Sequence, residues 1–356
     1  MSWIVFEKVG KKFGNKWTIP ELELSIARGE FFTLLGPSGC GKTTTLRLIA
    51  GLELADRGRI SIAGKDVTRL EPAARRIAMV FQNYALYPHM TVFENISYPL
   101  RVRRVAREEI EKRVKESAAK LRINHLLDCM PSQISGGEQQ RVAVCRAMVQ
   151  EPNAFLFDEP LSNLDARLRL EARRFLRKIQ KELSITAVYV THDQAEAMAM
   201  SDRVAVMKEG RLAQVGTPEE IYHRPADLFV AGFVGNFPMN FIAGEAAARD
   251  GKAFFRSGDF EIEIPSATKL KPGDKITLAI RPEHIDLSES PTAGLTGVIE
   301  DIEELGSEQI ITVSVSGKTL LARQTKKLEL KQQKSVGLKI PAAMLHIFDK
   351  EGKRIN

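Results

Sequence analysis

Short apolar runs alternate with longer segments of helical periodicity through the first two-thirds of the chain. Between the runs, apolar residues return every three or four positions, which is the period of an amphipathic helix. Each run is too short for a helix and is bounded by turn residues, so it predicts a buried strand. These runs lie at 31–35, 77–81, 154–157, 187–190 and 203–207. Strands that alternate with helices in this way are typical of an α/β fold with a mostly parallel sheet.

The pattern changes near residue 236. From there on, apolar and polar residues alternate in short segments that are separated by glycine, as in an antiparallel sheet. The predicted strands lie at 260–264, 276–280, 297–302 and 310–315. We therefore predict an α/β domain over residues 1–236 and a smaller all-β domain over residues 237–356.

A charge-rich segment at 102–123 has the spacing of a helix. Its apolar residues at helical intervals are Val105, Ile110, Val114, Ala118 and Leu121. Such a helix could offer a basic face to nucleic acid. Its positive charge is interrupted, however, by Glu108, Glu109, Glu111 and Glu116. Mixed charges at this spacing are typical of a solvated helix with ion pairs between residues four apart, which is the interpretation we favour.

Composition and charge narrow the class of protein. The 356 residues are 44% hydrophobic and 27% charged, as in soluble globular proteins. No apolar run approaches the roughly 18 residues that cross a bilayer, and residues 1–8 lack the pattern of a secretory signal, so we expect a cytosolic location. The net charge of +7 suits an anionic partner but more often serves solubility. The spacing of Cys40, Cys129 and Cys145 argues against disulfides and against a cysteine metal site.

A glycine-rich loop joins the first predicted strand to a helix that starts at Lys42. Its residues are Gly36, Pro37, Ser38, Gly39, Cys40, Gly41, Lys42 and Thr43, which fit the pattern G-x-x-x-x-G-K-[ST]. Small residues let backbone N–H groups surround a polyphosphate, and the helix directs its positive end at the same anion. We expect Lys42 on the β- and γ-phosphates and the Thr43 hydroxyl in the shell of Mg²⁺. We prefer this interpretation to a plain turn between strand and helix.

Two adjacent carboxylates, Asp158 and Glu159, follow the strand at 154–157 at its carboxyl end, where open α/β sheets bind ligands. Neighbouring side chains on a strand point to opposite faces, so we assign Asp158 to magnesium and Glu159 to a general base or water-orienting role. In isolation such a pair is more often a turn or a helix start. His192 follows the strand at 187–190 at the same edge, where it could hold the attacking water, although a lone histidine at a strand end is usually structural. Asp193 is predicted to cap the next helix, at 194–199.

A further motif lies between the loop and the carboxylates. Its residues are Ile134, Ser135, Gly136, Gly137, Glu138, Gln139, Gln140 and Arg141, and they resemble the signature motif of ATP-binding cassette (ABC) ATPases. The order of the motifs is also that of the family. In this resemblance Gln82 matches the glutamine that senses magnesium and the attacking water, and His192 matches the switch histidine. Asp165 matches the aspartate of the loop after the acidic pair, and Phe13 or, as second choice, Trp17 matches the aromatic that stacks on adenine.

The resemblance implies a P-loop ATP-binding domain with a mixed sheet and a helical subdomain, and ATP and Mg²⁺ as its cofactors. The catalytic residues that we expect are Glu159, His192, Gln82 and Lys42. The residues that we expect to contact the nucleotide are Phe13, Gly36, Pro37, Ser38, Gly39, Cys40, Gly41, Lys42, Thr43, Thr44, Ser135, Gly136, Gly137 and Asp165. The residues that we expect to hold magnesium are Thr43, Gln82 and Asp158.

The resemblance also implies partners. In the family, the signature of one subunit completes the ATP site of a second, antiparallel subunit, so we expect a homodimer that sandwiches two ATP molecules. Its motion would pass to separate membrane permease subunits, which places the chain on the cytoplasmic face of the cell membrane. An extracytoplasmic solute-binding protein is an indirect partner, and nucleic acid is not expected. The segment 84–89 after Gln82 is the expected docking surface, unless its apolar side chains belong to the core.

The C-terminal part points to the solute. Residues 238–241 and 280–285 resemble the small oligonucleotide-binding (OB) fold-like regulatory domain, or TOBE domain, of ATPases from maltose and other carbohydrate importers. We therefore expect a carbohydrate importer. Importers of sulfate, molybdate, ferric iron and polyamines carry comparable domains and remain alternatives. A cassette ATPase that acts on nucleic acid without transport is a more distant one.

The signature departs from its commonest form at two positions. Ile134 and Glu138 stand where the family most often has leucine and glutamine. Ser135, Gly136 and Gly137 are intact, so we expect the signature to function. The negative charge of Glu138 near a polyphosphate is expected to weaken nucleotide affinity.

Overall fold

The computed structural model describes residues 2–265, 270–289, 295–325, 328–329 and 331–356. The chain divides into two compact units, Met1–Ile221 and Tyr222–Asn356. Each unit is described by itself below.

The first unit is built on a six-stranded sheet in the order β10-β9-β3-β8-β7-β6. The strands are β3 (Phe31–Leu35), β6 (Ile77–Val80), β7 (Ala154–Asp158), β8 (Thr186–Thr191), β9 (Arg203–Lys208) and β10 (Arg211–Gly216). All neighbours pair in parallel except the edge strand β10. The strands predicted from the apolar runs are thus confirmed. Because they are parallel, the residues that follow β3, β7 and β8 all emerge at one edge of the sheet.

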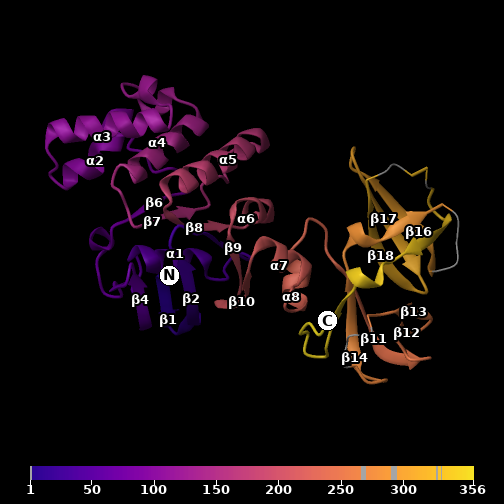
Figure 1. Ribbon diagram of the computed structural model, residues 1–356. Coiled ribbons are helices and arrows are strands. Elements are labelled where there is room, and N and C mark those ends of the chain that lie inside the picture. The colour runs from indigo at the N-terminus through magenta and orange to yellow at the C-terminus, as the bar shows by residue number, and fades with distance from the viewer. Residues whose placement is uncertain (1, 266–269, 290–294, 326–327, 330) are drawn as a thin grey trace. The chain divides into compact units, whose positions relative to one another are not determined.

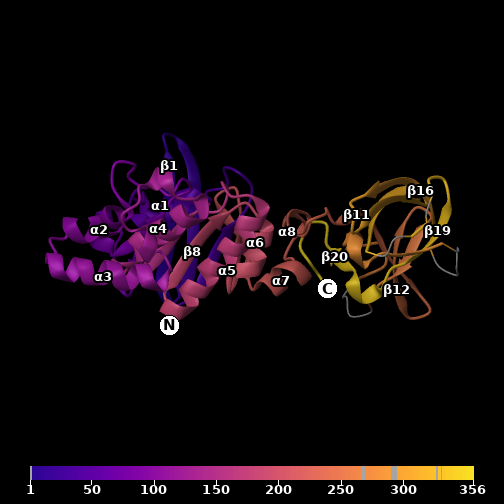
Figure 2. The same ribbon diagram turned by 90° about the horizontal axis from the view of Figure 1, so that it is seen from above.

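The two faces of this sheet are covered by different layers. Alternate side chains along β7 divide between them: Phe155 and Phe157 pack with helices α4 (Gly136–Met148) and α5 (Ala166–Leu183), while Leu156 packs with α1 (Lys42–Ala50) on the other face. Below α1 lies a four-stranded antiparallel sheet in the order β2-β1-β4-β5. Its strands are β1 (Ser2–Phe13), β2 (Lys16–Ala27), β4 (Arg57–Ile62) and β5 (Lys65–Asp66). Figure 2 shows α5 running alongside β8, on the face of the core sheet that α4 and α5 cover.

A helical part extends from the core sheet. It contains α2 (Val92–Val102), α3 (Arg107–Lys120) and α4, which Figure 1 shows gathered on one side of the first unit. The remaining helices of this unit include α6 (Gln194–Met200), and α7 (Pro218–His223) spans the change to the second unit. Short 3-10 turns lie at Pro72–Arg75, Asn124–Leu126 and Pro131–Gln133.

Helix α3 confirms the solvated-face interpretation of the segment at 102–123, but it is shorter than predicted. Ile110, Val114 and Ala118 are buried against the helical part, while exposed ion pairs of the i,i+4 type join Arg107 to Glu111 and Arg113 to Glu109. The segment does not form a single long helix. Its first residue is the last residue of α2. A turn separates α2 from α3, and within it Arg104 has a φ of 56°, which no α-helix accommodates.

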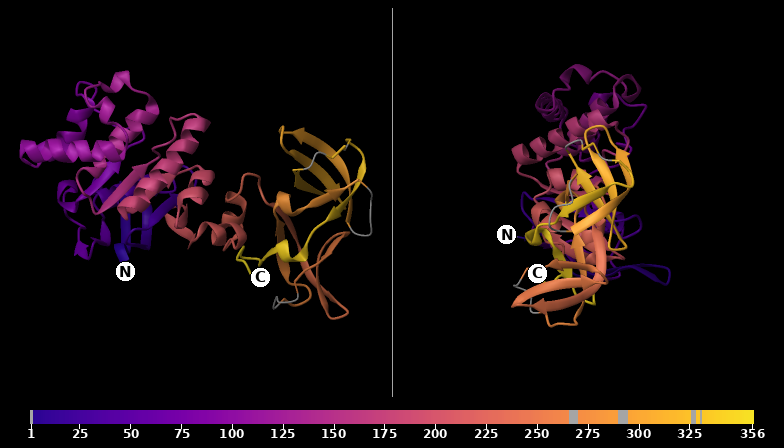
Figure 3. Two further views of the ribbon diagram at one scale, coloured as in Figure 1. Left: turned by 45° about the horizontal axis from the view of Figure 1, so that its top comes forward. Right: turned by 90° about the vertical axis from the view of Figure 1, so that its right-hand side faces the viewer.

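The second unit contains two five-stranded sheets around one core (Figure 3). One has the order β13-β12-β11-β14-β20, from β11 (Asn240–Arg249), β12 (Lys252–Ser257), β13 (Phe260–Glu263), β14 (Lys275–Ile280) and β20 (His346–Phe348). The other has the order β15-β19-β16-β17-β18, from β15 (Asp286–Ser288), β16 (Leu295–Glu304), β17 (Gln309–Val315), β18 (Lys318–Gln324) and β19 (Ser335–Lys339). All described pairings within both sheets are antiparallel, so the all-β prediction is confirmed.

Helix α8 (Leu228–Phe233) belongs to the second unit. Its residue Ala231 packs in a small buried cluster with Met239, Ala279 and Phe348. The compact unit therefore begins before the predicted boundary after residue 236. The predicted boundary between the two sequence domains stays a prediction. Short 3-10 turns in this unit lie at Pro282–His284 and Ala342–Met344.

Candidate functional site

The glycine-rich loop is a tight backbone ring that closes on Lys42. Gly39 and Gly41 have φ angles of 77° and 104°, a region that favours glycine. A side chain at Gly36 would lie 2.5 Å from the Met207 carbonyl oxygen, so only glycine fits there. The Lys42 ammonium points into the ring and donates to the carbonyl oxygens of Gly36 at 2.8 Å and Pro37 at 2.9 Å. The loop thus presents a buried cation and the start of α1 at the same point, as an anion site requires.

Asp158 lies beside this loop. The Thr43 hydroxyl donates to its carboxylate at a length of 3.4 Å, which joins the end of β7 to the first turn of α1. Burial raises the pKa of Asp158 above its usual range, and the hydrogen bond from Thr43 opposes that rise only in part. A half-buried carboxylate of this kind is stabilised by a cation. A hydroxyl and a carboxylate oxygen are hard ligands and fit Mg²⁺, which keeps most of its remaining ligands as water. Across the part of the chain that the structure describes, no group of three or more acidic, histidine or cysteine residues could hold a metal ion.

Glu159 and His192 meet at the carboxyl ends of β7 and β8. Nδ1 of His192 lies 3.1 Å from Oε2 of Glu159. Glu159 has a φ of 45°, and its backbone N–H donates to the Val190 carbonyl oxygen at 3.0 Å, so the turn that aims its side chain is anchored to the neighbouring strand. The carboxylate is partly exposed and the imidazole is largely exposed, which leaves both open to a ligand at this edge.

A buried glutamate that the residue pattern did not reveal accepts hydrogen bonds from β8, the strand that precedes His192. Glu196 is 3% exposed and accepts hydrogen bonds from the hydroxyls of Tyr189 and Thr191 at 2.8 and 2.7 Å. Burial raises its pKa. Asp193 caps α6 by accepting from the Glu196 backbone N–H at 3.1 Å, as predicted. One signal in the sequence could have indicated this contact: Tyr189 and Thr191 are two positions apart on β8, so their side chains point to the same face.

Gln82 and Asp165 lie on loops that touch one another. Asn163 donates from its side chain to the Gln82 carbonyl oxygen at 3.2 Å, which ties the segment after β6 to the loop after the acidic pair. Asp165 is the N-cap of α5, because its carboxylate accepts from the N–H groups of Arg167 and Leu168. This gives the aspartate a structural role, and its contact with nucleotide stays a prediction.

The signature segment forms the start of α4. Ser135 is the N-cap, and Oε2 of Glu138 accepts from its backbone N–H at 2.8 Å and from its hydroxyl at 2.7 Å. Gly136 and Gly137 form the first turn of α4, which is partly exposed, and a side chain at Gly137 would meet no atom within 4 Å. Figure 1 shows α4 within the helical part and α1 beneath the core sheet, so the signature and the glycine-rich loop start different helices.

The two candidate adenine-stacking residues lie at the tip of the β1–β2 hairpin. Phe13 is 48% exposed and Trp17 is 41% exposed. The Trp17 ring is flanked by Arg57, whose guanidinium lies 4.8 Å from its centroid, and by the Lys12 ammonium at 6.0 Å. Among the described residues, Lys11 is the one cation over the Phe13 ring, at 5.0 Å from its centroid. Its less covered ring supports Phe13 as the first choice, and its contact with adenine stays a prediction.

Part of the segment 84–89 belongs to the core, and part of it lies on the surface that was predicted for docking. Tyr84 is 5% exposed and belongs to the core. Tyr87 is half-buried, with its ring 4.9 Å from that of Tyr98 and 5.6 Å from the Arg146 guanidinium. Ala85, Pro88 and His89 are exposed. The segment is therefore a surface held in place by one buried residue.

Comparison with known proteins identifies relatives over the whole length. Family models for "ABC transporter", "MalK OB fold domain" and "TOBE domain" match residues 19–162, 238–285 and 278–348. The trehalose/maltose import ATP-binding protein MalK of Thermococcus litoralis is 45% identical, covering 100% of both chains. The sn-glycerol-3-phosphate import ATP-binding protein UgpC of Escherichia coli is 44% identical, covering 100% of both. Among solved structures, cbiO1 of Clostridium perfringens, part of the ABC transporter complex cbiONQ, is 29% identical with a TM-score of 0.58, covering 62% of this chain and 91% of its own.

Proposed function

Because this chain belongs to the ATP-binding subunits of ABC transporters, we propose that it powers solute import by hydrolysing ATP between two copies of itself. The chain is an ATPase with a P-loop domain and a C-terminal OB-fold part, and both were predicted from the motifs. The observation that carries the proposal is the convergence of Lys42, Asp158, Glu159 and His192 at one edge of the parallel sheet.

Each residue at this edge has a role that follows from its chemistry. Lys42 and the loop N–H groups bind the β- and γ-phosphates. Mg²⁺, held by Thr43, Asp158 and Gln82, would neutralise phosphate charge. Glu159 accepts the proton of the attacking water, and a base within hydrogen-bond reach of that water accelerates such reactions by about a hundredfold or more. His192, in contact with the Glu159 carboxylate, orients the water toward the γ-phosphate.

The signature completes the site from a second copy of the chain. Ser135 is exposed, and the N–H groups of Gly136 and Gly137 belong to the partly exposed first turn of α4, a kind of helix start that binds phosphate. In an antiparallel homodimer this helix would approach the γ-phosphate of the ATP bound by the other copy. The difference in affinity of the closed dimer for ATP over ADP and phosphate would then drive opening and closing.

Permease subunits receive this motion. The relatives are import ATP-binding subunits of membrane complexes, and the part of this chain that the structure describes has no helix long and apolar enough to cross a membrane. We propose that Ala85, Tyr87, Pro88 and His89 dock on the cytoplasmic side of separate permease subunits. An extracytoplasmic solute-binding protein would act only through those permeases.

A carbohydrate is the solute that we propose, because MalK of T. litoralis is named for trehalose and maltose. Glycerol 3-phosphate, the solute in the name of UgpC, is the nearest alternative. Sulfate, molybdate, ferric iron and polyamines are alternatives of other chemical classes, which the comparisons do not favour.

The test is reconstitution. The chain would be purified with the permeases that copurify from membranes, placed in lipid nanodiscs with the matching binding protein, and assayed for solute-stimulated ATPase activity. Stimulation by a maltose-type sugar supports the full proposal. Stimulation by glycerol 3-phosphate or an inorganic anion keeps the importer and overturns the carbohydrate, and absence of ATP cleavage in every complex overturns the importer.

A further inference from the structure

The opposite edge of the core sheet, away from the phosphate loop, contains a pocket. It has a volume of about 320 Å³ and lies where β7 and β8 begin, between the turn at Arg28 and the residues before Ala154. Its walls include Trp3, Arg28, Met148, Phe155, Leu183 and Ser184. A volume of this size holds a ring system of a few fused or linked rings. None of the roles assigned to the nucleotide edge uses these residues.

One wall of the pocket is a fixed aromatic surface. The indole N–H of Trp3 donates to the Asn153 carbonyl oxygen at 2.8 Å, which sets the ring against the start of β7. The Arg28 guanidinium lies 4.9 Å from the Trp3 ring centroid. Because the indole is fixed in this way, a planar ring can pack against the part of it that lines the pocket, beside the Arg28 guanidinium, at little cost in conformational entropy.

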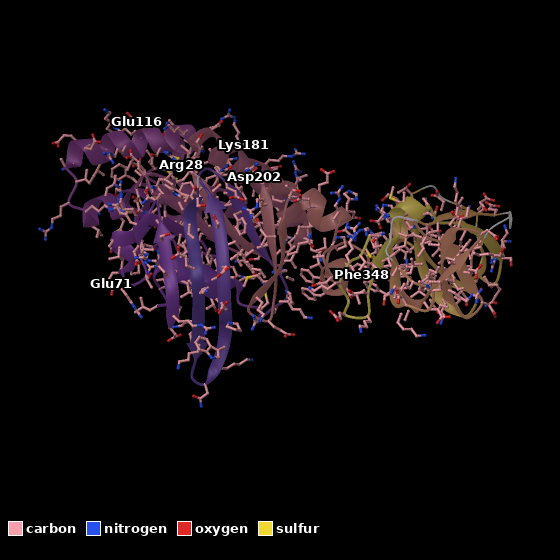
Figure 4. The ribbon with its side chains drawn as sticks, turned by 60° about the horizontal axis from the view of Figure 1, so that its bottom comes forward. Arg28, Glu71, Glu116, Lys181, Asp202 and Phe348 are labelled. Carbon is pink, nitrogen blue, oxygen red and sulfur yellow. The ribbon has the colours of Figure 1, made fainter. Side chains whose placement is uncertain are left out.

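A second cavity, of about 500 Å³, lies beside the first. It shares Arg28 and Ser184 in its walls and adds Lys181 and Arg177. The Arg177 guanidinium is neutralised by Asp202, to which it donates at 3.0 Å. Within the described part of the chain, neither Arg28 nor Lys181 makes an ion pair with a carboxylate, so this end of the cleft is cationic. Figure 4 labels Arg28, Lys181 and Asp202 on the first unit.

Among the described residues that line the apolar end, Glu151 carries the one carboxylate. It lies on the exposed rim, 3.9 Å from the Arg113 guanidinium, so its charge is partly offset. The cleft thus has an aromatic and apolar end and a cationic end about Arg28. We propose that it binds a small molecule that combines a planar apolar ring with an anionic group, the ring against Trp3 and the anion on Arg28 and Lys181.

Two strands of the core sheet join this site to the nucleotide edge. β7 and β8, whose first residues border the pocket, carry Glu159 and His192 just beyond their other ends. Two kinds of small molecule share the required chemistry: an aromatic carboxylate and a nucleoside monophosphate. The test separates them.

The test uses the two tryptophans as reporters. The full chain, labelled with 5-fluorotryptophan, gives two ¹⁹F signals, from Trp3 and Trp17, and the Trp17→Phe variant assigns them. The probes are 2-naphthoate, its neutral analogue 2-naphthylmethanol, acetate, and adenosine 5′-monophosphate. We expect 2-naphthoate to shift the Trp3 signal saturably with a Kd of about 1 mM or below, and 2-naphthylmethanol and acetate to bind at least about tenfold more weakly. Adenosine monophosphate that shifts Trp3 identifies a nucleotide site, and a shift of Trp17 alone leaves the aromatic carboxylate as the ligand class.

Matched variants test the anion contacts. Arg28→Met keeps the apolar stem against Trp3 and removes the charge, and Lys181→Met removes the second charge. Each is expected to weaken 2-naphthoate about tenfold, while the exposed Arg69→Met does not. An unchanged thermal unfolding midpoint for each variant shows that the fold is intact. A Trp3 signal that stays still at saturating 2-naphthoate, or that moves equally with the neutral analogue or in both Met variants, overturns the proposal.

Discussion

His192 and Glu159 are separated by 33 positions in the chain, yet Nδ1 of the first lies 3.1 Å from Oε2 of the second. The parallel register of β7 and β8, in which Asp158 pairs with Val190, brings them together. The positive φ of Glu159 then turns its carboxylate away from Asp158 and toward the imidazole. The two acids of the pair are therefore divided by geometry, Asp158 toward Thr43 and Glu159 toward His192.

Replacing Glu159 by glutamine separates chemistry from binding. Glu159→Gln keeps the size and a hydrogen bond to His192 but removes the base, so we expect ATP hydrolysis to fall by about a hundredfold or more. ATP-dependent dimerisation, measured by size-exclusion chromatography with ATP and Mg²⁺, should persist because the phosphate contacts remain. Glu171→Gln, an exposed change on α5, is the control. A variant that hydrolyses normally contradicts the base assignment, and one that fails to dimerise with ATP shows that Glu159 shapes the fold instead.

We expect Cys40 to make the phosphate loop sensitive to thiol reagents. Cys40 is 3% exposed and its sulfur lies 3.8 Å from the Lys42 ammonium, so an added group has no room unless the lysine moves. We expect N-ethylmaleimide to abolish ATPase activity and bound ATP to slow the modification. Cys40→Ser, with Cys129 and Cys145 intact, should resist inactivation. Unchanged ATP turnover after complete modification of Cys40, verified by mass spectrometry, would contradict this prediction.

Tyr87 tests the docking surface. Tyr87→Ala removes a ring that is held between Tyr98 and Arg146 beside the exposed part of the segment 84–89. We expect solute uptake by the reconstituted complex to fall severalfold, while the ATPase activity of the subunit without permeases changes by less than about twofold. Tyr87→Phe, which keeps the ring, is the control. Normal uptake by Tyr87→Ala contradicts docking at this residue.

The elements that sequence reasoning predicted are those fixed by local pattern. The apolar run 154–157 is too short for a helix and forms the predicted buried strand, and glycine permits the φ angles that Gly39 and Gly41 adopt in the phosphate loop. The cap at Asp193 follows from the short polar side chain before a helix. These features depend on a few neighbouring residues, so the sequence alone is sufficient for them.

The features that were missed depend on contacts between distant segments. Glu196 resembles an ordinary helix glutamate until the tertiary fold places Tyr189 and Thr191 against it. The burial of Tyr84 depends on the core of the helical part, and the pocket at Trp3 depends on a contact with Asn153, which is 150 positions away. The turn between α2 and α3 was also missed, because the apolar residues keep a helical spacing on both sides of it.

A buried histidine makes the second unit sensitive to acid. His346 is 6% exposed, its Nδ1 has no hydrogen-bond partner among the described residues, and burial lowers its pKa from 6.5 to about 3. Repulsion by neighbouring charges lowers the pKa of His346 further, and these charges belong to Arg354, Arg281, His284 and His223. The unfolded chain therefore binds a proton that the folded unit excludes between about pH 6.5 and pH 3, and stability falls as the pH is lowered through this window.

The measurement is urea unfolding of the full chain, followed at a probe in the second unit at several pH values. We expect His346→Gln to reduce the dependence of the unfolding free energy on pH by up to about 1 kcal/mol per pH unit below pH 6. His89→Gln, an exposed change in the first unit, is the control. An identical pH dependence in the parent and in His346→Gln contradicts a buried neutral imidazole.

Glu138 provides the last test, because the structure gives its carboxylate two effects that can be separated. It accepts hydrogen bonds from the side chain and backbone of Ser135, and these lower its pKa, so it is negative at neutral pH. That charge lies at the start of α4, beside the N–H groups expected to bind phosphate, and it also holds Ser135 in position.

Glu138→Gln removes the charge and keeps an oxygen that can accept from Ser135. We expect the KM for ATP to fall severalfold, more at low than at high salt, because repulsion between the carboxylate and the polyphosphate is screened by ions. Glu138→Asp is the matched control: it keeps the charge on a side chain too short to close the capping box, so it should not lower the KM. If Glu138→Gln leaves the KM unchanged at low salt, the carboxylate serves only to position Ser135, and the departure from the common signature has no effect on nucleotide affinity.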